Sequence, residues 1–448
     1  MNRSRRSTLA LLQLLVSCLA ADAVHAQVVI ARQGDVAPGT GGGTFNVFSP
    51  QVAIDGLGHV AFKSSIMGGT ASEGVFLDRG NGLIAVAVEG DVAPGSGGGT
   101  FALVGEPALN ALGDLAFTAV VSGGTFGTVL YVYSGGQYTI VATSLDAAPG
   151  TNGGSYSAFG PRLSMNAAGE IAFKAVVTGA GNTSSGIFVE GGPSSRPVFL
   201  RGEATPAALP GTYFGFGDAN INAVGDVVAI AGISPTSGPF RNGVVVETGG
   251  VDEIVALVGD PAPGTGAGTY SEISTAATPA IDASRQVFFY AKVTGGTSSS
   301  GLFVDDGVTQ SAVVLPGQPV PGLAGVNYFA FSLFPISAND AGEIGFTSIL
   351  TNASSGVFVG PTGAAAQLVA KTGDPVPGTG GGSYFLLVSN PAINSWGRAA
   401  FVSQLSGGTT GSVVVAVPEP GAVGSTFAVI GLLAHARRRS KRFPYRNL

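Results

Sequence analysis

The chain has 448 residues, of which 45% are hydrophobic and 11% are charged, so it has enough apolar residues to form a core. Residues 27–417 carry 12 basic and 25 acidic side chains, a net charge of −13, and this balance argues against nucleic acid as a partner. The same stretch has no Cys and a single His, His59, which excludes a Cys-containing zinc cluster, a Cys nucleophile and a pair of imidazole bases.

The first 26 residues have the pattern of a secretory signal peptide. They combine a basic start with an apolar run too short to span a bilayer, and they end on small residues. We therefore expect export, with cleavage between Ala26 and Gln27. Two alternatives remain: Cys18 ends a segment that resembles a lipobox and would be the lipidated first residue, and Arg5-Arg6 resembles a twin-arginine start.

An eight-residue pattern of the form NxxGxxAF dominates residues 28–417. It occurs seven times, about every 56 residues, which indicates a repeat architecture. The copies begin at Asp55, Asn110, Asn166, Asn222, Asp282, Asn339 and Asn394. The first residue and the Gly fit the first and fourth places of a tight turn, because Asn can bond the turn backbone and Gly accepts positive φ.

Two copies depart from this pattern. Val228-Ala229 replaces the Ala-Phe pair in the fourth copy, and Ser284-Arg285 replaces the Gly turn in the fifth. We expect these two repeats to pack differently from the others.

Four short strands are predicted in each repeat. In the second repeat they span residues 101–109, 114–121, 128–133 and 138–143, and each is rich in Val, Phe, Tyr, Ile and Ala. Gly135-Gly136 suits a two-residue hairpin between the last two strands. No window has the pattern of an amphipathic helix, so the fold class is predicted to be all-β.

A second motif, of the form GDxxPG, runs in phase with the first. Its second position is Asp35, Asp91, Asp146, Glu203, Asp260, Gln318 or Asp374. Ten residues later an aromatic residue follows in every repeat: Phe45, Phe101, Tyr156, Tyr213, Tyr270, Tyr328 and Tyr384. Because a free linker would drift in length, the loop is predicted to be a fixed part of the structure.

The two ends of the repeat array favour a closed ring. The last repeat has three strands and ends at Val417, whereas an extra strand, Val28 to Arg32, precedes the first repeat. These ends fit a seven-bladed β-propeller of four-stranded blades in which the N-terminal strand completes the last blade, and closure removes exposed sheet edges. The alternative is an open β-solenoid, which does not need complementary ends.

The C-terminal tail, residues 418–448, carries a sorting pattern. Pro418-Glu419-Pro420 is followed by an apolar stretch, residues 421–434, and by a basic cluster that begins at Arg437-Arg438-Arg439. The stretch is short for a permanent membrane span but long enough for transient insertion, with the basic end on the cytoplasmic side. The tail resembles a PEP-CTERM sorting signal. This resemblance implies handling by an exosortase in a Gram-negative bacterium and an association with exopolysaccharide.

The repeats themselves resemble a choice-of-anchor tandem-repeat family that is named for its NxxGxxAF motif. The resemblance covers nearly all of residues 28–417. That family has no established activity, so the resemblance implies no substrate and no catalytic residue.

The acidic loop residues are the only candidates for a metal site. Ca²⁺ prefers several carboxylate and carbonyl oxygens, and Asp35, Asp91, Asp146, Asp260 and Asp374 would each bring one carboxylate. No DxDxDG spacing occurs. We favour the interpretation in which each Asp bonds its own turn, and so we expect no cofactor.

The seven loop aromatics have two interpretations. They could form a ring at one mouth of the channel, where their faces would stack on sugar rings. They could instead fill the gaps between blades, which we favour. The Phe residues of the AF pairs are likewise expected to pack between blades rather than to bind a ligand.

An enzyme on this scaffold would need paired carboxylates at the channel mouth. Asp305 and Asp306 are a pair, but with Gly307 they fit a hairpin turn better. His59 follows a turn Gly and is expected on the surface, and no GxSxG motif supports a Ser-His-Asp triad. We therefore expect a protein that is not an enzyme.

The sequence thus predicts three parts: a signal peptide over residues 1–26, a propeller over 27–417 and a sorting tail over 418–448. The expected function is a structural or binding role at the cell surface or in the extracellular matrix, with an exopolysaccharide or another surface component as the partner. The alternative is an extracellular polysaccharide hydrolase or lyase.

Overall fold

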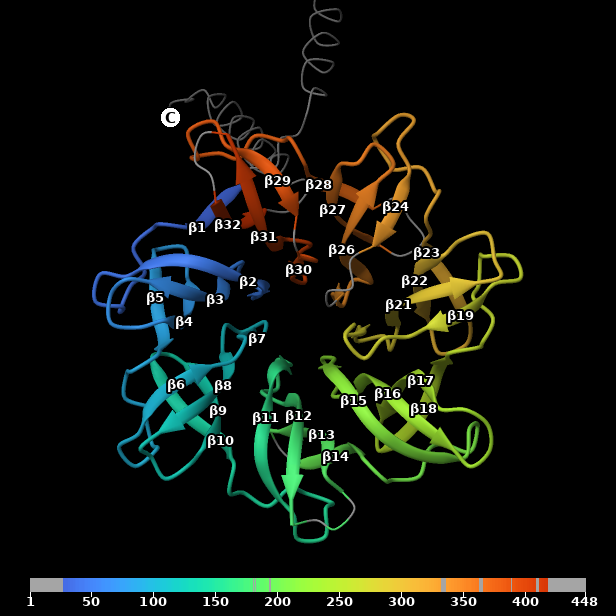
Figure 1. Ribbon diagram of the computed structural model, residues 1–448, viewed down its shortest axis with the longest axis horizontal. Coiled ribbons are helices and arrows are strands. Elements are labelled where there is room, and N and C mark those ends of the chain that lie inside the picture. The colour runs from blue at the N-terminus through green and yellow to red at the C-terminus, as the bar shows by residue number, and fades with distance from the viewer. Residues whose placement is uncertain are drawn as a thin grey trace, which may run out of the picture.

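Seven β-sheets stand around a central axis and form a seven-bladed β-propeller (Figure 1). The computed structural model describes residues 27–417 except 180, 182, 193–194, 332–335, 362–365, 388 and 408–410. All the elements it describes are strands, and no helix in this part of the chain is long and apolar enough to cross a membrane. The predicted signal peptide and the predicted sorting tail lie outside the described residues.

The blades follow one another in chain order, and in each the first strands are innermost and line the central channel. Blade 1 contains β2 (Thr44–Ile54), β3 (Val60–Met67), β4 (Glu73–Asp78) and β5 (Leu83–Val88), and blade 2 contains β6 (Thr100–Val104), β7 (Ala108–Leu109), β8 (Leu115–Ser122), β9 (Thr128–Ser134) and β10 (Gln137–Thr143). Blade 3 contains β11 (Ser155–Met165), β12 (Ile171–Thr178), β13 (Ser185–Glu190) and β14 (Arg196–Leu200). Blade 4 contains β15 (Gly211–Ile221), β16 (Val227–Pro235), β17 (Arg241–Thr248) and β18 (Val251–Leu257). Blade 5 contains β19 (Thr269–Glu272), β20 (Ala280–Ile281), β21 (Val287–Thr294), β22 (Ser300–Asp305) and β23 (Gln310–Val314). Blade 6 contains β24 (Tyr328–Phe331), β25 (Ser337–Ala338), β26 (Glu343–Leu350), β27 (Ser355–Pro361) and β28 (Gln367–Lys371). Blade 7 contains β29 (Ser383–Leu387), β30 (Ala392–Ile393), β31 (Ala399–Ser406) and β32 (Gly411–Val417), together with β1 (Val28–Arg32).

The ring closes as the sequence predicted. β1 pairs antiparallel with β32, with Val28 opposite Ala416 and Arg32 opposite Val413. Blade 7 is therefore built from β29 to β32 and receives its outermost strand from the other end of the chain. Closure leaves no blade with a missing strand, which rules out the open solenoid.

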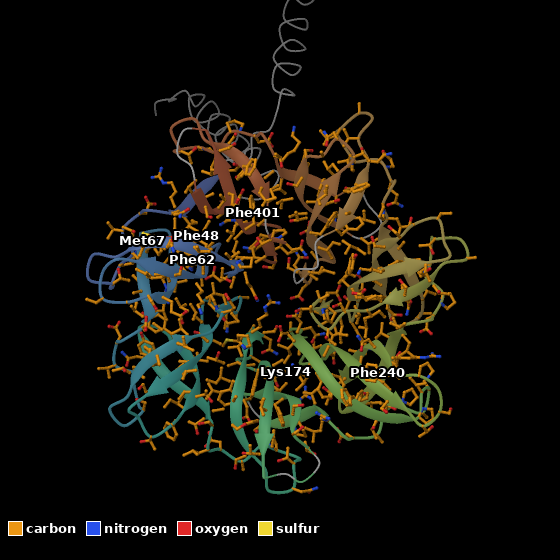
Figure 2. The ribbon with its side chains drawn as sticks, in the orientation of Figure 1. Phe48, Phe62, Met67, Lys174, Phe240 and Phe401 are labelled. Carbon is orange, nitrogen blue, oxygen red and sulfur yellow. The ribbon has the colours of Figure 1, made fainter. Side chains whose placement is uncertain are left out.

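The hydrophobic core lies between the blades. Each of seven clusters of buried residues combines side chains from two neighbouring blades. The AF pair explains this, because successive strand residues point to opposite faces of a sheet. In blade 1, Ala61 packs with blade 2 while Phe62 packs with blade 7. Figure 2 shows Phe62 beside Phe48, with ring centroids 5.5 Å apart.

Blade 4 packs differently, as expected from its altered motif. Ala229 takes the place of the AF Phe, and the space is filled by Phe199 from β14 of blade 3. The Phe199 ring lies 5.6 Å from the ring of Tyr213 and 6.0 Å from that of Phe216, both on blade 4. A large side chain from the neighbouring blade thus replaces the missing one.

Blade 5 keeps its turn despite losing the Gly. Arg285 adopts the left-handed conformation that Gly has in the other turns, with φ of 65°. The turn geometry is therefore retained at the cost of backbone strain.

The innermost strand of blade 2 is not continuous, although residues 101–109 were predicted as one strand. It is interrupted between β6 and β7, where Gly105 N donates to Thr118 O and Glu106 N donates to Pro161 O of blade 3. Pro107 has no N–H to give to the ladder. The strand therefore kinks, and its backbone bonds to the next blade.

Candidate functional site

The GDxxPG loops are closed by backbone hydrogen bonds, which explains their fixed length. Gly34 N donates to Phe45 O over 2.8 Å, and Phe45 N donates to Asp35 O over 2.9 Å. The bond from the aromatic N–H to the carbonyl of the acidic or Gln position occurs in all seven repeats. The ten-residue spacing is thus set by a loop that joins one blade to the next.

Four of the five Asp side chains of these loops bond their own turns. The carboxylates of Asp35, Asp146, Asp260 and Asp374 each accept a hydrogen bond from the backbone N–H three residues earlier, at 2.7 to 3.0 Å. Gln318 Oε1 does the same with Leu315 N, so the position needs an acceptor rather than a charge. No three His, Cys, Asp or Glu residues in the described part of the chain are placed to hold a metal ion.

The seven loop aromatics are buried and do not form an open ring at a channel mouth. Their side chains are 1–3% exposed. In blade 1, the Phe45 ring packs edge-on against Phe76 at 4.9 Å and against Phe62 at 5.6 Å. Because their faces are covered by neighbouring rings, these residues offer no surface on which a sugar could stack.

The NxxG turns are held by the side chain of their first residue. In all seven turns its Oδ1 atom accepts hydrogen bonds from the backbone N–H groups two and four residues later. Gly113, at the fourth place of the turn in blade 2, has a φ of 89°. The turn predicted from the sequence is therefore confirmed.

The same side chains also link neighbouring blades. Nδ2 of Asn166 donates to Asn222 O over 3.1 Å, and Nδ2 of Asn222 donates to Asp282 O over 2.8 Å. Asn339 and Asn394 make equivalent bonds to the following blade, both of 2.9 Å. The motif therefore serves the ring, and it leaves little of the Asn side chain for a ligand.

The sequence predicted His59 on the surface because it follows a turn Gly, but the structure shows a partly buried side chain. Its side chain is 25% exposed, and Nδ1 lies 2.6 Å from Oδ2 of Asp55. Four of the other turns have Asn at the first position and an acid four residues later, as in Asn110–Asp114. In blade 1 the acid, Asp55, is at the first position and His59 is four residues later, so His59 takes part in holding the turn.

The described residues that line the middle of the central channel include polar side chains but no charged ones. A cavity of about 270 Å³ lies there, enclosed by the innermost strands of all seven blades. The residue before each NxxG turn lines it, and these residues are Ile54, Leu109, Met165, Ile221, Ile281, Ala338 and Ile393. A paired-carboxylate site is therefore not built into this wall.

Charged side chains gather where the inner strands of blades 2 to 4 kink. Burial raises the pKa values of Glu106 and Asp218. Arg162 lies 3.7 Å from Asp218, and Lys63 and Arg162 partly offset the burial of Glu106. Lys174 donates to Phe216 O over 2.8 Å. Since cations and anions alternate from blade to blade, we infer that these side chains stabilise the contacts between neighbouring blades.

A large groove lies between blades 3 and 4, and we call it the blade 3–4 groove. Its volume is about 820 Å³, within the range of roughly 300–1,000 Å³ that is usual for ligand pockets. It runs between β14, the loop that follows β14, and the β17–β18 hairpin. Its charged lining consists of Arg196 and five carboxylates, those of Glu170, Glu203, Asp226, Glu247 and Asp252.

Every carboxylate of the groove is held by a protein donor. Glu247 accepts from Arg196 Nη1 over 2.6 Å, and Asp252 accepts from the Tyr213 hydroxyl over 3.0 Å. Glu203 accepts from a backbone N–H, while Glu170 and Asp226 accept from the Asn residues of their own turns. These oxygens keep further lone pairs, so the groove presents acceptors that are already in place.

Burial and neighbouring carboxylates shift the titration of this site. Desolvation raises the pKa of Asp252 to about 6, the Tyr213 hydrogen bond opposes the rise, and the charges of Glu203 and Glu247 add to it. Desolvation and the Asp252 charge raise the pKa of Tyr213. The raised pKa of Asp252 sets it apart from an ordinary surface carboxylate.

The groove was not anticipated from the sequence. A signal for it existed, because Val251 to Leu257 is the only fourth strand among the seven repeats that contains acidic residues. The position of Asp252 is occupied by Tyr138 in blade 2 and by Gln310 in blade 5. A position that varies while the surrounding repeat is kept is where a site on a repeat scaffold should be sought.

Several solved propeller structures are similar to the chain at low sequence identity. The propeller domain of the trilobed protease from Pyrococcus furiosus is 9% identical, over 84% of this chain and 94% of that one, with a TM-score of 0.45. The Aleuria aurantia lectin is 12% identical over 73% and 97% of the two chains, with a TM-score of 0.31. An ulvan lyase of polysaccharide lyase family PL25 is 10% identical over 87% and 95%, with a TM-score of 0.38.

Among curated protein sequences, none matches the chain. A family described as being of unknown function, DUF7453, matches residues 22–360 and 351–415. These two matches together cover nearly the whole propeller. The chain therefore belongs to the DUF7453 family.

Proposed function

We propose that the protein binds an extracellular polysaccharide and that the blade 3–4 groove is its binding site. The observation that carries the proposal is a groove of about 820 Å³ whose five carboxylates are already fixed by protein donors. Sugar hydroxyls are hydrogen-bond donors, and fixed acceptors bind them at little cost in side-chain entropy. With one Arg against five acids, the groove suits neutral or amino-bearing sugars and repels uronates.

The cellular setting of this proposal comes from the two ends of the chain. The pattern of residues 1–26 favours export, and the tail from Pro418 to the cluster at Arg437 resembles a PEP-CTERM signal. Together with the NxxGxxAF repeats, these features support sorting by an exosortase, through transient membrane insertion, to the surface or matrix of a Gram-negative bacterium. Exopolysaccharide is the partner that such a location supplies.

A second candidate function is cleavage of the same polymer. One observation favours it: carboxylates from blades 3 and 4 meet in one groove, and the pKa of Asp252 is raised to about 6, as a general acid requires. Binding is the better supported of the two, because Asp252 already accepts from Tyr213 and Glu247 is paired with Arg196. These contacts fix the carboxylates as acceptors.

The test uses residues 27–417 with exopolysaccharide from the producing bacterium, and with cello-, chitosan and galacturonate oligosaccharides as defined probes. We expect cosedimentation with unchanged polymer length, and binding of the neutral and amino sugars but not of the uronate. Asp252→Asn removes the charge yet keeps an acceptor for Tyr213, and should weaken binding about tenfold. Asp305→Asn in the exposed hairpin of blade 5 is the matched control.

Two results would contradict the proposal. Shortened polymer chains that persist in Asp305→Asn but vanish in Asp252→Asn would establish cleavage instead. Equal affinity of the wild type and both variants would move the binding site away from the groove.

A further inference from the structure

One face of the propeller carries a ring of exposed apolar side chains. They occupy the third position of the NxxG turns, and the large members Leu57, Leu112, Val224 and Trp396 are 64–71% exposed. We call this set the apolar corona; it consists of Leu57, Leu112, Ala168, Val224, Ala341 and Trp396. The turn of blade 5 has the polar residue Ser284 at this position. Because turns of neighbouring blades are joined by hydrogen bonds, as between Asn394 and Asp55, the corona encircles one mouth of the channel.

This face, which we call the turn face, is opposite the one that carries the GDxxPG loops. In blade 1 the innermost strand β2 starts at Thr44, which pairs with Val36 of the loop, and ends at Ile54 next to the turn. Eleven residues of strand separate the two faces by on the order of 30 Å. The exposed loop residue Val92 of blade 2 therefore lies on the face away from the corona.

Both ends of the propeller leave from the turn face. Val417 pairs with Ala399, which directly follows the turn of blade 7, and Val28 pairs with Ala416. The chain continues from Val417 into a tail with an apolar stretch at residues 421–434 and a basic cluster after it. A tail that enters a membrane from this point brings the turn face, and not the loop face, towards the lipid.

We propose that the turn face docks on a lipid bilayer, with the apolar corona in the boundary between headgroups and acyl chains. The inference rests on membrane insertion of the tail, which is part of the proposed function. Scattered apolar residues are ordinary on protein surfaces, but here they share one repeat position, surround one axis and lie on the face from which the tail departs. Trp396, the only Trp of the chain, is the residue type that prefers a membrane interface.

A single Trp makes the contact measurable. Residues 27–448 are mixed with vesicles of phosphatidylcholine or of its brominated form, and bound chains are separated by flotation. We expect the emission of Trp396 to shift to shorter wavelength on binding and to fall about twofold in brominated vesicles, since interfacial side chains lie within reach of the acyl chains.

Two variants separate docking from mere proximity of the tail. In a Trp396→Phe background, Leu112→Trp places the probe in the corona on blade 2, and Val92→Trp places it on the opposite face of the same blade. Docking predicts quenching of the first and not of the second. A chain that floats while the probes at 396 and 112 stay unquenched overturns the proposal, and so does equal quenching at 92.

A further arm distinguishes this proposal from the sorting proposal. The ring closes within residues 27–417, so this part can be tethered by a C-terminal His tag to nickel-chelating lipid. If the full chain does not float but the tethered propeller shows quenching at 396 and 112, tail insertion fails and docking stands. If neither form is quenched, docking fails. A blue-shifted Trp396 in a dimer without lipid would also overturn it, because a second copy would then cover the corona.

Discussion

Asn394 and Asp55 are 339 residues apart in the sequence, yet Nδ2 of Asn394 donates a 2.9 Å hydrogen bond to the backbone carbonyl oxygen of Asp55. The bond joins blade 7 to blade 1 at the channel, while β1 and β32 join the two ends of the chain at the outer rim. Oδ1 of the same Asn394 accepts from Trp396 N and Arg398 N. One buried side chain thus shapes its turn and closes the ring.

Asn394→Ala should therefore destabilise the propeller by about 3 kcal/mol, because buried backbone groups lose their partners. Asn394→Asp keeps the acceptor and should cost less. Ser395→Ala, an exposed change in the same turn, should stay within about 0.5 kcal/mol of the wild type. The measurement is the free energy of unfolding in denaturant, and equal values for Asn394→Ala and Ser395→Ala would refute a closing role.

The exchange between Phe199 and Ala229 can be tested by a double-mutant cycle. Phe199→Ala should cost about 3–5 kcal/mol, since it leaves a cavity beside Tyr213. Adding Ala229→Phe supplies a ring from blade 4 itself, as in the other blades, and should restore a large part of the loss. Strictly additive free energies in the cycle would show that the two positions do not share one space.

The turn of blade 5 offers a test of backbone strain. Arg285 has a φ of 65°, and its side chain pairs with Glu253 and bonds Thr248. Arg285→Ala loses these contacts but keeps the strain, whereas Arg285→Gly loses both, so the Gly variant should be more stable than the Ala variant by about 1 kcal/mol. Gly342→Ala, at the same place in blade 6 with φ of 74°, should be destabilising to a similar extent. If the Gly and Ala variants at 285 unfold together, the turn is not strained.

The raised pKa of Asp252 predicts two pH effects. Its folded-state pKa of about 6 lies above the ordinary value of 3.8, so the folded protein holds this proton more tightly than the unfolded chain. The contribution of Asp252 to stability should therefore fall as pH rises from about 4 to 6 and stay constant above. Asp252→Asn should remove this fall. Calorimetric melting of both proteins across this range measures the difference, and parallel curves would contradict the shift.

Binding should change in the opposite direction. An ionised carboxylate is the stronger acceptor for sugar hydroxyls, so affinity for a neutral sugar, which does not titrate itself, should rise between pH 5 and 7 in the wild type. In Asp252→Asn it should be flat over this range. Titration calorimetry with cello-oligosaccharides at the two pH values would detect the change, and a flat wild-type profile would exclude Asp252 from the contact.

Much of the fold could be predicted from the sequence, because the same turn and loop motifs recur in every repeat. The spare strand at Val28 and the missing one after Val417 predicted closure, and Asn110 with Gly113 predicted the turn. The break before β7 was missed because Pro107 lies in an otherwise apolar run that reads as one strand. Phe199 was missed because it compensates for a residue on another blade.

The groove was harder to foresee for a related reason. Its carboxylates come from a loop, two turns and a hairpin, and each one alone fits a local role. Glu203 and Asp226 repeat positions that are structural in every blade, so only their meeting with Glu247 and Asp252 makes a site. That meeting depends on how two blades stand next to each other, which no local pattern encodes.

The most direct test of the binding site is hydrogen–deuterium exchange of residues 27–417 with and without a saturating neutral or amino oligosaccharide. We expect slower exchange in the segments that line the blade 3–4 groove, residues 196–206 and 247–252, with the corresponding segments of the other blades unchanged. Protection at the NxxG turns of blades 1, 2, 5, 6 and 7, or no protection in the presence of demonstrated binding, would contradict a glycan site in the groove.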